Sequence, residues 1–109
     1  MFLPYLKDQE SSFIDITGGA GAKVLSPKSA IVTVGAAALY GLSLGLRKEY
    51  EASKVRVHEL RIGMFVGRDE EKGKKHSNFE IGRFASKIAS TPHTEHLIRL
   101  YKQEDFEAL

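Results

Sequence analysis

The sequence predicts an α/β fold with about three parallel strands and two main helices. Two observations lead to this expectation: an apolar strand, a long helix and a second apolar strand follow one another over residues 13–63, and an amphipathic helix precedes a last apolar run over residues 77–101. Parallel neighbours need a crossover connection of a dozen or more residues, which a helix supplies. With 109 residues, the chain is long enough for one domain with its own core.

The composition narrows the class of protein. The chain is 42% hydrophobic and 28% charged, as is ordinary for a soluble globular protein. The net charge is only +2 and basic residues alternate with acids, which argues against nucleic-acid binding. The absence of cysteine excludes a disulfide, a thiolate nucleophile and a zinc–thiolate site. The opening residues 1–7 lack the length and basic leader of a secretory signal, so we expect a cytoplasmic protein.

The first strand is predicted at Phe13–Thr17, a β-branched and aromatic run stopped by Gly18 and Gly19. Ligands of open α/β sheets bind beyond the carboxyl ends of strands. The glycine turn over residues 18–21 is therefore a candidate ligand site. Downstream, Pro27 keeps the residue before it out of the helical region, so the next helix begins after it.

The long helix predicted at Ser29–Leu46 carries no charged residue over its eighteen positions. That length meets the requirement for a membrane span, and Gly41-x-x-x-Gly45 is a close-packing motif of membrane helices. Its strongly apolar residues supply about −3.5 kcal/mol of insertion free energy, which the glycines, serines and threonine reduce. The flanking strands also need a covering helix. We therefore expect this helix to lie on the sheet rather than span a membrane.

A helix that is apolar on every side is expected to be buried on every side. One face can lie on the sheet, and the other face needs a second cover. The remaining helices of the chain are one alternative, and a second copy of the chain is the alternative that we favour. An unpaired sheet edge beside Phe13–Thr17 is a further surface that recruits partners. We thus predict a homo-oligomer through residues 29–46, with contacts at Val34, Ala38, Gly41, Leu42 and Gly45.

The second strand is predicted within residues 55–66. Val55 and Val57 would lie on one face and Leu60 and Ile62 on the other, a pattern that suits a strand buried on both faces. Residues 67–77 contain no apolar side chain and predict a flexible loop.

A capping box of Ser77 and Glu80 opens the second helix, whose apolar residues recur at helical spacing until Thr91-Pro92. Residues 95–101 then predict the last strand.

Few residues outside these elements indicate chemistry. His93-x-x-His96 could present two imidazoles, but a metal site needs a third ligand and supporting hydrogen bonds, so we expect no metal. His58 is expected to be packed or hydrogen-bonded within its strand. Tyr40 is expected to pack, because no lysine follows four residues later. Asp15 is the acid of most interest, either as a loop cap or as a general base without an obvious partner.

The segment Ile14–Gly21 resembles the catalytic strand and turn of the short-chain dehydrogenase/reductase (SDR) family. Ala20-Gly21 matches the alanine–glycine pair that follows the serine-rich turn of the family, and Gly18 stands at the catalytic serine. The helix that follows in the family begins Tyr-x-x-x-Lys and continues with small residues, which Ala37-Ala38-Leu39 match. This register places Val32 at the tyrosine and Ala36 at the lysine, and a one-residue slip would place Ile31 and Gly35 there instead.

The segment Arg56–Gly63 is similar to the next strand of the family, with Ile62 where the family has proline. Phe2–Lys7 resembles the end of the preceding helix, and residues 79–101 follow the order of the family. Over residues 1–109, the resemblance implies a partial Rossmann-like, three-layer unit that corresponds to the carboxyl-terminal half of the family fold.

The resemblance also implies what the chain lacks. In the family, tyrosine transfers the proton, lysine lowers the pKa of that tyrosine, and serine polarises the carbonyl of the substrate. Valine, alanine and glycine perform none of these steps. The glycine-rich dinucleotide fingerprint belongs to an amino-terminal half without a counterpart in this sequence.

These departures imply a divergent or truncated reductase-like protein that is inactive by itself. No cofactor is expected for this chain alone. NAD(P) is expected only if an amino-terminal partner segment completes the fold, with Gly18 and Gly63 as contact candidates. The alternatives are a non-enzymatic oligomerisation or interaction module on the same scaffold, and a small membrane-associated protein.

Overall fold

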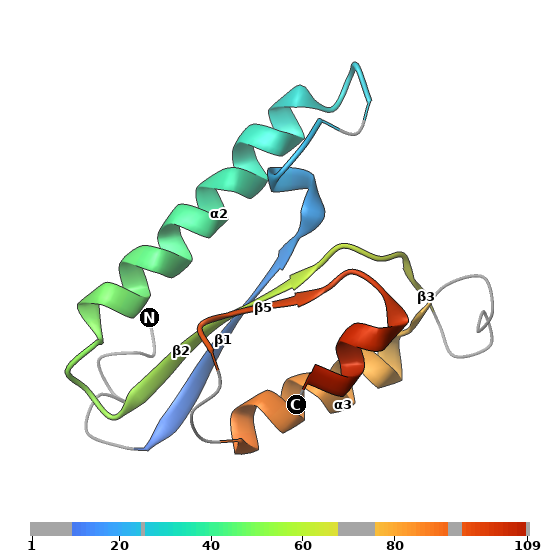
Figure 1. The fold of residues 1–109 in the computed structure, drawn as a ribbon. Coiled ribbons are helices and arrows are strands. Elements are labelled where there is room, and N and C mark those ends of the chain that lie inside the picture. Colours follow the sequence, from blue (N-terminus) through green and yellow to red (C-terminus); the bar gives the residue numbers. More distant parts are fainter. Residues whose placement is uncertain (1–9, 25, 68–75, 92–94, 109) are drawn as a thin grey trace.

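The computed structural model describes residues 10–24, 26–67, 76–91 and 95–108. The predicted amino-terminal segment, residues 1–7, lies outside this part. Figure 1 shows a sheet with one helix on each face, so that the fold has three layers. The elements in chain order are β1 (Ser11–Gly18), η1 (Gly19–Gly21), α2 (Ala30–Glu49), β2 (Val55–Ile62), β3 (Val66–Gly67), β4 (His76–Ser77), α3 (Asn78–Ser90), β5 (Leu97–Leu100) and η3 (Gln103–Ala108).

The main sheet has the strand order β1-β2-β5, and both pairs of neighbours are parallel. The β1–β2 register runs from Ser11 beside Val55 to Gly18 beside Ile62. The shorter β5 joins only the second half of β2, from Glu59 onward. Three parallel strands and two main helices confirm the predicted fold class, and β1 forms one edge of this sheet.

The two faces of the sheet carry separate apolar clusters. On the face covered by α3, the core consists of Leu60, Ile98 and Leu100 from the strands and Ile81, Phe84 and Ile88 from the helix. On the face covered by α2, Val55 and Val57 pack with Leu46. The predicted division of the β2 side chains between two buried faces is thus confirmed.

The observed bounds of α2 and β2 differ from the predicted ones. The helix α2 runs on to Glu49, with Arg47 and Lys48 in its last turn, where basic side chains interact favourably with the helix dipole. The strand β2 stops at Ile62 instead of residue 66. It stops there because the chain then leaves the sheet, and residues 66–67 pair with β4 instead.

The predicted loop at residues 67–77 has ordered ends, because Gly67 and His76–Ser77 belong to the parallel β3–β4 pair. Residues 68–75 lie outside the described part of the chain. Ser77 is the N-cap of α3, as expected, and its Oγ accepts a hydrogen bond from the backbone N–H of Phe79 at 3.2 Å.

Candidate functional site

A buried polar cluster lies between α2 and the sheet, near the carboxyl ends of β1 and β2. Thr17 on β1 and Arg61 on β2 both contact Glu59, whose residue is only 2% exposed. The Thr17 hydroxyl donates a hydrogen bond to Glu59 Oε2 at 2.9 Å, and Arg61 Nε donates to the same oxygen at 2.7 Å. Together with Tyr40, these residues form what we call the Arg61 cluster.

Tyr40 joins α2 to this cluster. The guanidinium carbon of Arg61 lies 3.5 Å from the centroid of the Tyr40 ring, which is a cation–π contact. The Tyr40 hydroxyl donates a hydrogen bond to the backbone carbonyl of Gly18. A Cβ atom on Gly21 would lie 2.6 Å from the Tyr40 ring. The turn that the sequence suggested as a ligand site is therefore filled by a side chain of the protein itself.

Gly18 and Gly63, the two candidates for cofactor contact, do lie at the same edge of the sheet. Gly18 pairs with the residue before Gly63, and a Cβ on Gly19 would approach the Gly63 Cα to 3.4 Å. The Gly63 N–H donates to the carbonyl of Leu100 at 2.8 Å, and the ring of Tyr101 lies where a Gly63 side chain would be. The Gly18 carbonyl is also bonded, so Tyr40 and Tyr101 occupy the space beside both glycines at this edge.

The positive charge of Arg61 is stabilised by its neighbours. Burial would lower the pKa of the guanidinium, but the hydrogen bond and negative charge of Glu59, with smaller effects of Tyr40 and Tyr101, raise that pKa above its usual value. Both members of the ion pair are shielded from water, with side-chain exposures of 12% for Arg61 and 2% for Glu59. This pair lies within β2 and holds the Arg61 guanidinium in place, where the Tyr40 ring of α2 contacts it.

Asp15 lies beside Glu59 in the β1–β2 register and faces α2 as well. One of its carboxylate oxygens is buried without a hydrogen-bond partner in the described structure. Burial raises the pKa of Asp15, the negative charge of Glu59 raises it further, and His96 opposes the shift. The partner that the sequence did not indicate for Asp15 is thus another carboxyl group, which already binds Arg61.

The three positions that the resemblance assigned to catalysis carry no ionisable side chain. Gly18 ends β1, Val32 is 56% exposed on the first turns of α2, and Ala36 is half-buried one turn later. The predicted contact residues behave differently. All five, Val34, Ala38, Gly41, Leu42 and Gly45, are exposed on α2.

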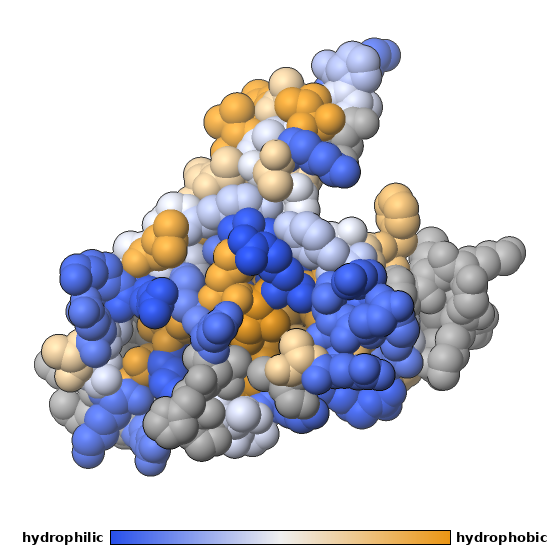
Figure 2. Space-filling model, viewed as in Figure 1, coloured by the Kyte–Doolittle hydropathy of each residue, from blue (hydrophilic) through white to orange (hydrophobic). Residues whose placement is uncertain are grey.

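Only one stripe of α2 is covered by its own chain. The residues of this stripe recur every three or four positions and are Thr33, Ala36, Tyr40, Ser43 and Leu46, followed by the C-cap residue Tyr50. The single chain thus covers one face of this helix, as expected, and the cover predicted for the other face is a second copy. Apolar side chains outside the stripe are 41–80% exposed, namely Ile31, Val32, Val34, Leu39, Leu42 and Leu44. Figure 2 shows hydrophobic atoms along the outer part of this helix.

By length and composition alone, α2 qualifies as a helix that could cross a membrane, and only 11% of its apolar window is buried in the protein. In the described residues it is the one helix of this kind. Cβ atoms on Gly35, Gly41 and Gly45 would meet nothing within 4 Å. The outer face of α2 is therefore apolar, shallow and open, and it is the most prominent candidate interaction surface.

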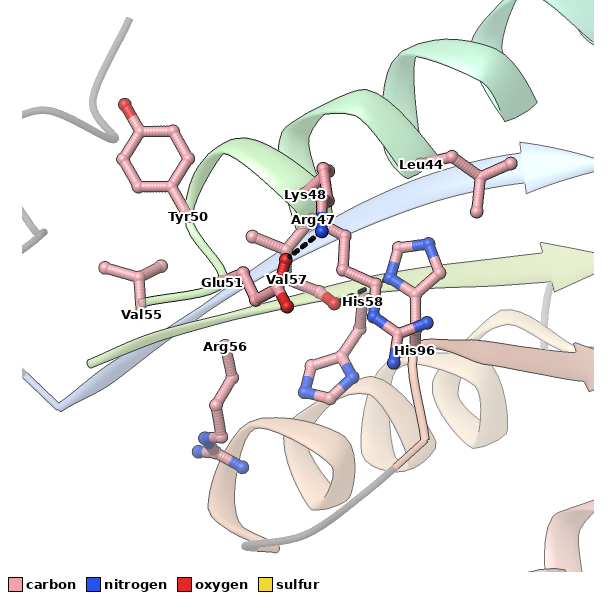
Figure 3. A pocket seen from close by; sticks show the side chains of 10 residues that line it. All are labelled: Leu44, Arg47, Lys48, Tyr50, Glu51, Val55, Arg56, Val57, His58 and His96. Carbon is pink, nitrogen blue, oxygen red and sulfur yellow. Dashed lines mark hydrogen bonds and ion pairs between the residues drawn. The ribbon is translucent and has the colours of Figure 1, made fainter. Parts of the chain in front are cut away.

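A second candidate site is a cavity of about 660 Å³ at the other end of the sheet. It lies between the last turn of α2, the start of β2 and the residue before β5, as Figure 3 shows. We call it the basic cavity, because its lining includes three cationic side chains and two histidines. Its lining residues are Leu44, Arg47, Lys48, Tyr50, Glu51, Val55, Arg56, Val57, His58 and His96.

Two of the three cations of the basic cavity have partners. Lys48 forms an ion pair with Glu51 at 2.7 Å. The Arg56 guanidinium donates to the carbonyls of Ala89 and Thr91 at 2.6 Å and so caps the end of α3. For Arg47, the described structure records no hydrogen bond or ion pair.

The hydrogen bonds of the two histidines fix which nitrogen carries the proton. Nδ1 of His58 lies 2.9 Å from the carbonyl of Glu95, and Nδ1 of His96 lies 2.8 Å from the carbonyl of Val57. Because a carbonyl can only accept, each Nδ1 carries a proton, and each Nε2 of a neutral ring is an acceptor. Ser43 Oγ lies 3.4 Å from Nε2 of His96. Nε2 of His58 is buried and has no partner among the described residues.

Burial lowers the pKa of His58, and the nearby charges of Arg56, His96 and Arg47 lower it further against the opposing hydrogen bond to Glu95. His58 is therefore neutral near pH 7. The histidine pair proposed from the sequence, His93 and His96, cannot be compared directly, because His93 lies outside the described residues. Within the described residues, no three side chains of the metal-binding types come together.

No protein-family model, curated protein or solved structure matched this chain. The outer face of α2 and the basic cavity are the two surfaces of this chain that can indicate a function.

Proposed function

We propose that this protein is a non-enzymatic self-association module, in which two copies join through the outer face of α2. The observation that carries the proposal is the exposure of this face: between Lys28 and Arg47 it bears no charge, and its large apolar side chains are 41–80% exposed. Contiguous apolar patches of this kind mark interaction sites on soluble proteins.

The Arg61 cluster supports the proposal by making the surface rigid. Tyr40 ties the middle of α2 to Arg61 and to the end of β1, and Ser43 lies fully buried one turn later. A face that is already held in place loses little conformational entropy on association, which favours binding. We therefore assign these buried polar groups a supporting role rather than a catalytic one.

The connections of α2 argue against a membrane span. The strand before it and the strand after it, β1 and β2, pair side by side along eight residues. A spanning helix would place these two strands on opposite sides of the bilayer and break that ladder. A protein partner covers the outer face without this loss, and we place the module in the cytoplasm on this ground and on the absence of cysteine.

A second copy is the partner that the residue types favour. The outer face carries Ala38, Gly41 and Gly45 beside the larger Val34 and Leu42. Small residues on both partners allow two helices to approach closely, and the large ones then fill the grooves.

The edge strand β1 supports the same pairing. The N–H groups of Glu59 in β2 and of Gly63 just after it donate to carbonyls on the β5 side. The even-numbered residues of β2 therefore direct their N–H and C=O groups to β1. In a parallel ladder, the β1 residues that lie directly beside those β2 residues direct their own N–H and C=O groups away from β2. The outward groups of β1 thus belong to Ser12, Ile14, Ile16 and Gly18, and the carbonyl of Gly18 is the one that Tyr40 already binds.

Two copies of β1 can pair antiparallel about a twofold axis that is perpendicular to the sheet and passes between Ile14 and the partner's Ile14. The remaining outward N–H and C=O groups of β1 would then bond to those of the partner. This arrangement pairs Ser12 with the partner's Ile16 and joins the two sheets into one of six strands. It also sets Asp15 opposite the partner's Phe13, so that like charges are not opposed.

Both copies of α2 then lie on the same face of this joined sheet. Because α2 contacts both β1 and β2 and strands are about 4.8 Å apart, the two helix axes come within roughly 10 Å, the usual distance for packed helices.

The size of this interface predicts a weak dimer. About 17 Å of strand edge and about 27 Å of helix flank, each roughly 10 Å deep, bury on the order of 1,000 Å² over both copies. That area is at the lower end for specific complexes, so we expect a dissociation constant in the micromolar range.

The resemblance to reductases enters the proposal only as a scaffold. We propose that this chain by itself neither binds NAD(P) nor transfers hydride, because its glycine turn is not a dinucleotide fingerprint and Gly18, Val32 and Ala36 offer no proton donor, acceptor or cation. Titration calorimetry with NAD and NADP tests this part. Saturable binding of either nucleotide to the chain alone would contradict it.

Light scattering coupled to size exclusion tests the self-association. The protein should elute as a dimer at about 100 μM and dissociate on dilution, whereas Leu42→Lys should remain monomeric throughout. The matched control is Phe65→Lys, which places the same charge on an apolar residue that is 83% exposed outside α2. A monomer at millimolar concentration would overturn the proposal, and so would flotation of the protein with lipid vesicles.

A further inference from the structure

The basic cavity carries an inference that is independent of self-association. Its volume of about 660 Å³ lies in the range of small-molecule sites. Its side chains include the cations Arg47, Lys48 and Arg56 and a single acid, Glu51, so that the lining carries a net positive charge. An occupant of this cavity should therefore be an anion.

The cation available to such an anion is Arg47. Lys48 is neutralised by Glu51, and Arg56 is engaged by the carbonyls at the end of α3. In Figure 3 the Arg47 side chain extends from the last turn of α2 into the space that the cavity residues surround. A guanidinium presents several N–H donors in one plane, which suits carboxylate and phosphate oxygens.

The second requirement comes from His58, which is 2% exposed and lines the same cavity. Its Nδ1–H is committed to the carbonyl of Glu95, and its buried Nε2 is an acceptor without a partner. Buried polar atoms in proteins nearly always have a hydrogen-bond partner, so a donor is expected at this nitrogen. A group with an O–H would satisfy it.

We propose that the basic cavity binds a small oxyanion that carries both negatively charged oxygens and one O–H group, with Arg47 binding the charge and Nε2 of His58 accepting the hydrogen bond. Phosphate and phosphate monoesters in their singly protonated forms have this chemistry, and so do 2-hydroxycarboxylates. Fully ionised sulfate and simple carboxylates satisfy the arginine but leave Nε2 unpaired.

Inorganic phosphate and sulfate at pH 8 test the proposal, because phosphate retains one proton there and sulfate retains none. The readout is the ¹⁵N shift of His58 Nε2 in the full chain. We expect saturable shifts with millimolar phosphate and at least ten-fold weaker binding of sulfate, a factor that corresponds to about 1.4 kcal/mol. Glycolate against acetate repeats the comparison and separates the hydroxycarboxylate class from the phosphate class.

Two variants locate the site. Arg47→Gln should weaken phosphate binding about ten-fold, whereas Arg99→Gln, which removes an exposed arginine on β5 outside the cavity, should leave it unchanged. Equal responses to phosphate and sulfate would overturn the proposal, and so would equal losses of phosphate binding in the two variants. Absence of saturation at 50 mM phosphate would also overturn it, because this concentration is of the order of ten times the expected dissociation constant. None of these outcomes bears on the dimer.

Discussion

The guanidinium of Arg61 on β2 lies over the ring of Tyr40 on α2, with the guanidinium carbon 3.5 Å from the ring centroid. This contact decides how the carboxyl edge of the sheet is used. The ring fills the space beside the glycine turn, and its hydroxyl binds the last carbonyl of β1. An edge that would bind a ligand in a larger α/β protein here holds a helix in place.

The close approach of Tyr40 to the turn predicts strong coupling between Gly21 and the ring. Gly21→Ala should lower the free energy of unfolding by about 2 kcal/mol, because the new methyl would lie within 3 Å of the ring atoms. In a Tyr40→Leu background the same change should have less than half this effect. Urea denaturation of the four proteins measures the coupling. Additive losses would show that the ring does not constrain the turn.

The ion pair of Glu59 and Arg61 predicts a second double-mutant result. Glu59→Gln leaves a buried guanidinium without its counter-charge and should lower stability by about 3 kcal/mol. Replacing both residues by apolar ones of similar volume, Glu59→Leu with Arg61→Met, should cost less than Glu59→Gln alone or Arg61→Met alone. Thermal unfolding of the three variants tests the order. A double variant that is the least stable of them would contradict a purely supporting role for the pair.

The sequence predicted the layers of this fold because the apolar periodicity of β2 and α3 is strong. It did not predict the Arg61 cluster, because its members come from β1, α2 and β2 and meet only in the fold. One signal was present: Glu59 and Arg61 are two residues apart in a strand and therefore share a face. A charged pair on a face that a long uncharged helix covers indicates a buried ion pair.

The sequence also predicted that the sheet covers only one face of the long helix, and α2 is indeed buried along one stripe. Composition shows that such a helix needs covers, but it does not show how much cover one small sheet supplies. The basic cavity depends equally on the fold, since β5 begins only beside Glu59 and leaves the start of β2 open on that side. Residues 58 and 96 are far apart in the sequence and no motif connects them.

Asp15 predicts an unusual dependence of stability on pH. Its pKa in the folded protein is raised above the value of 3.8 expected when unfolded, so the folded state binds the proton more tightly. The contribution of Asp15 to stability is therefore most favourable at low pH, falls as the pH rises through the interval between the two pKa values, and is constant above it. Other carboxyl groups in the chain add their own dependence.

Asp15→Asn isolates this contribution. The variant should match the natural protein near pH 3 and be more stable by up to about 1 kcal/mol at pH 7, where two carboxylates otherwise face each other across β1 and β2. Urea denaturation from pH 3 to pH 7 measures the difference, and Glu107→Gln on the exposed carboxyl-terminal helix is the control. A variant that loses stability as the pH rises relative to the natural protein would contradict the assignment.

The edge of β1 supplies the last prediction, which separates edge pairing from helix contact. The N–H of Ile16 points away from β2, so Ile16→Pro should leave the internal ladder intact while it removes a hydrogen-bond donor and adds bulk at the edge. We expect at least a ten-fold weaker dimer. Ile16→Thr keeps the N–H and the β-branched shape at this 58% exposed position and should dimerise normally.

A cross-link gives the direct test, since the chain contains no cysteine. In the proposed register, the Cα atoms of Ile14 and the partner's Ile14 are about 5.5 Å apart, a distance that a disulfide spans. Ile14→Cys should therefore form a covalent dimer on mild oxidation, whereas Val24→Cys, exposed in the loop before α2, should not. If Leu42→Lys abolishes the dimer while Ile16→Pro and Ile14→Cys have no effect, the helix contact stands and the edge pairing is wrong.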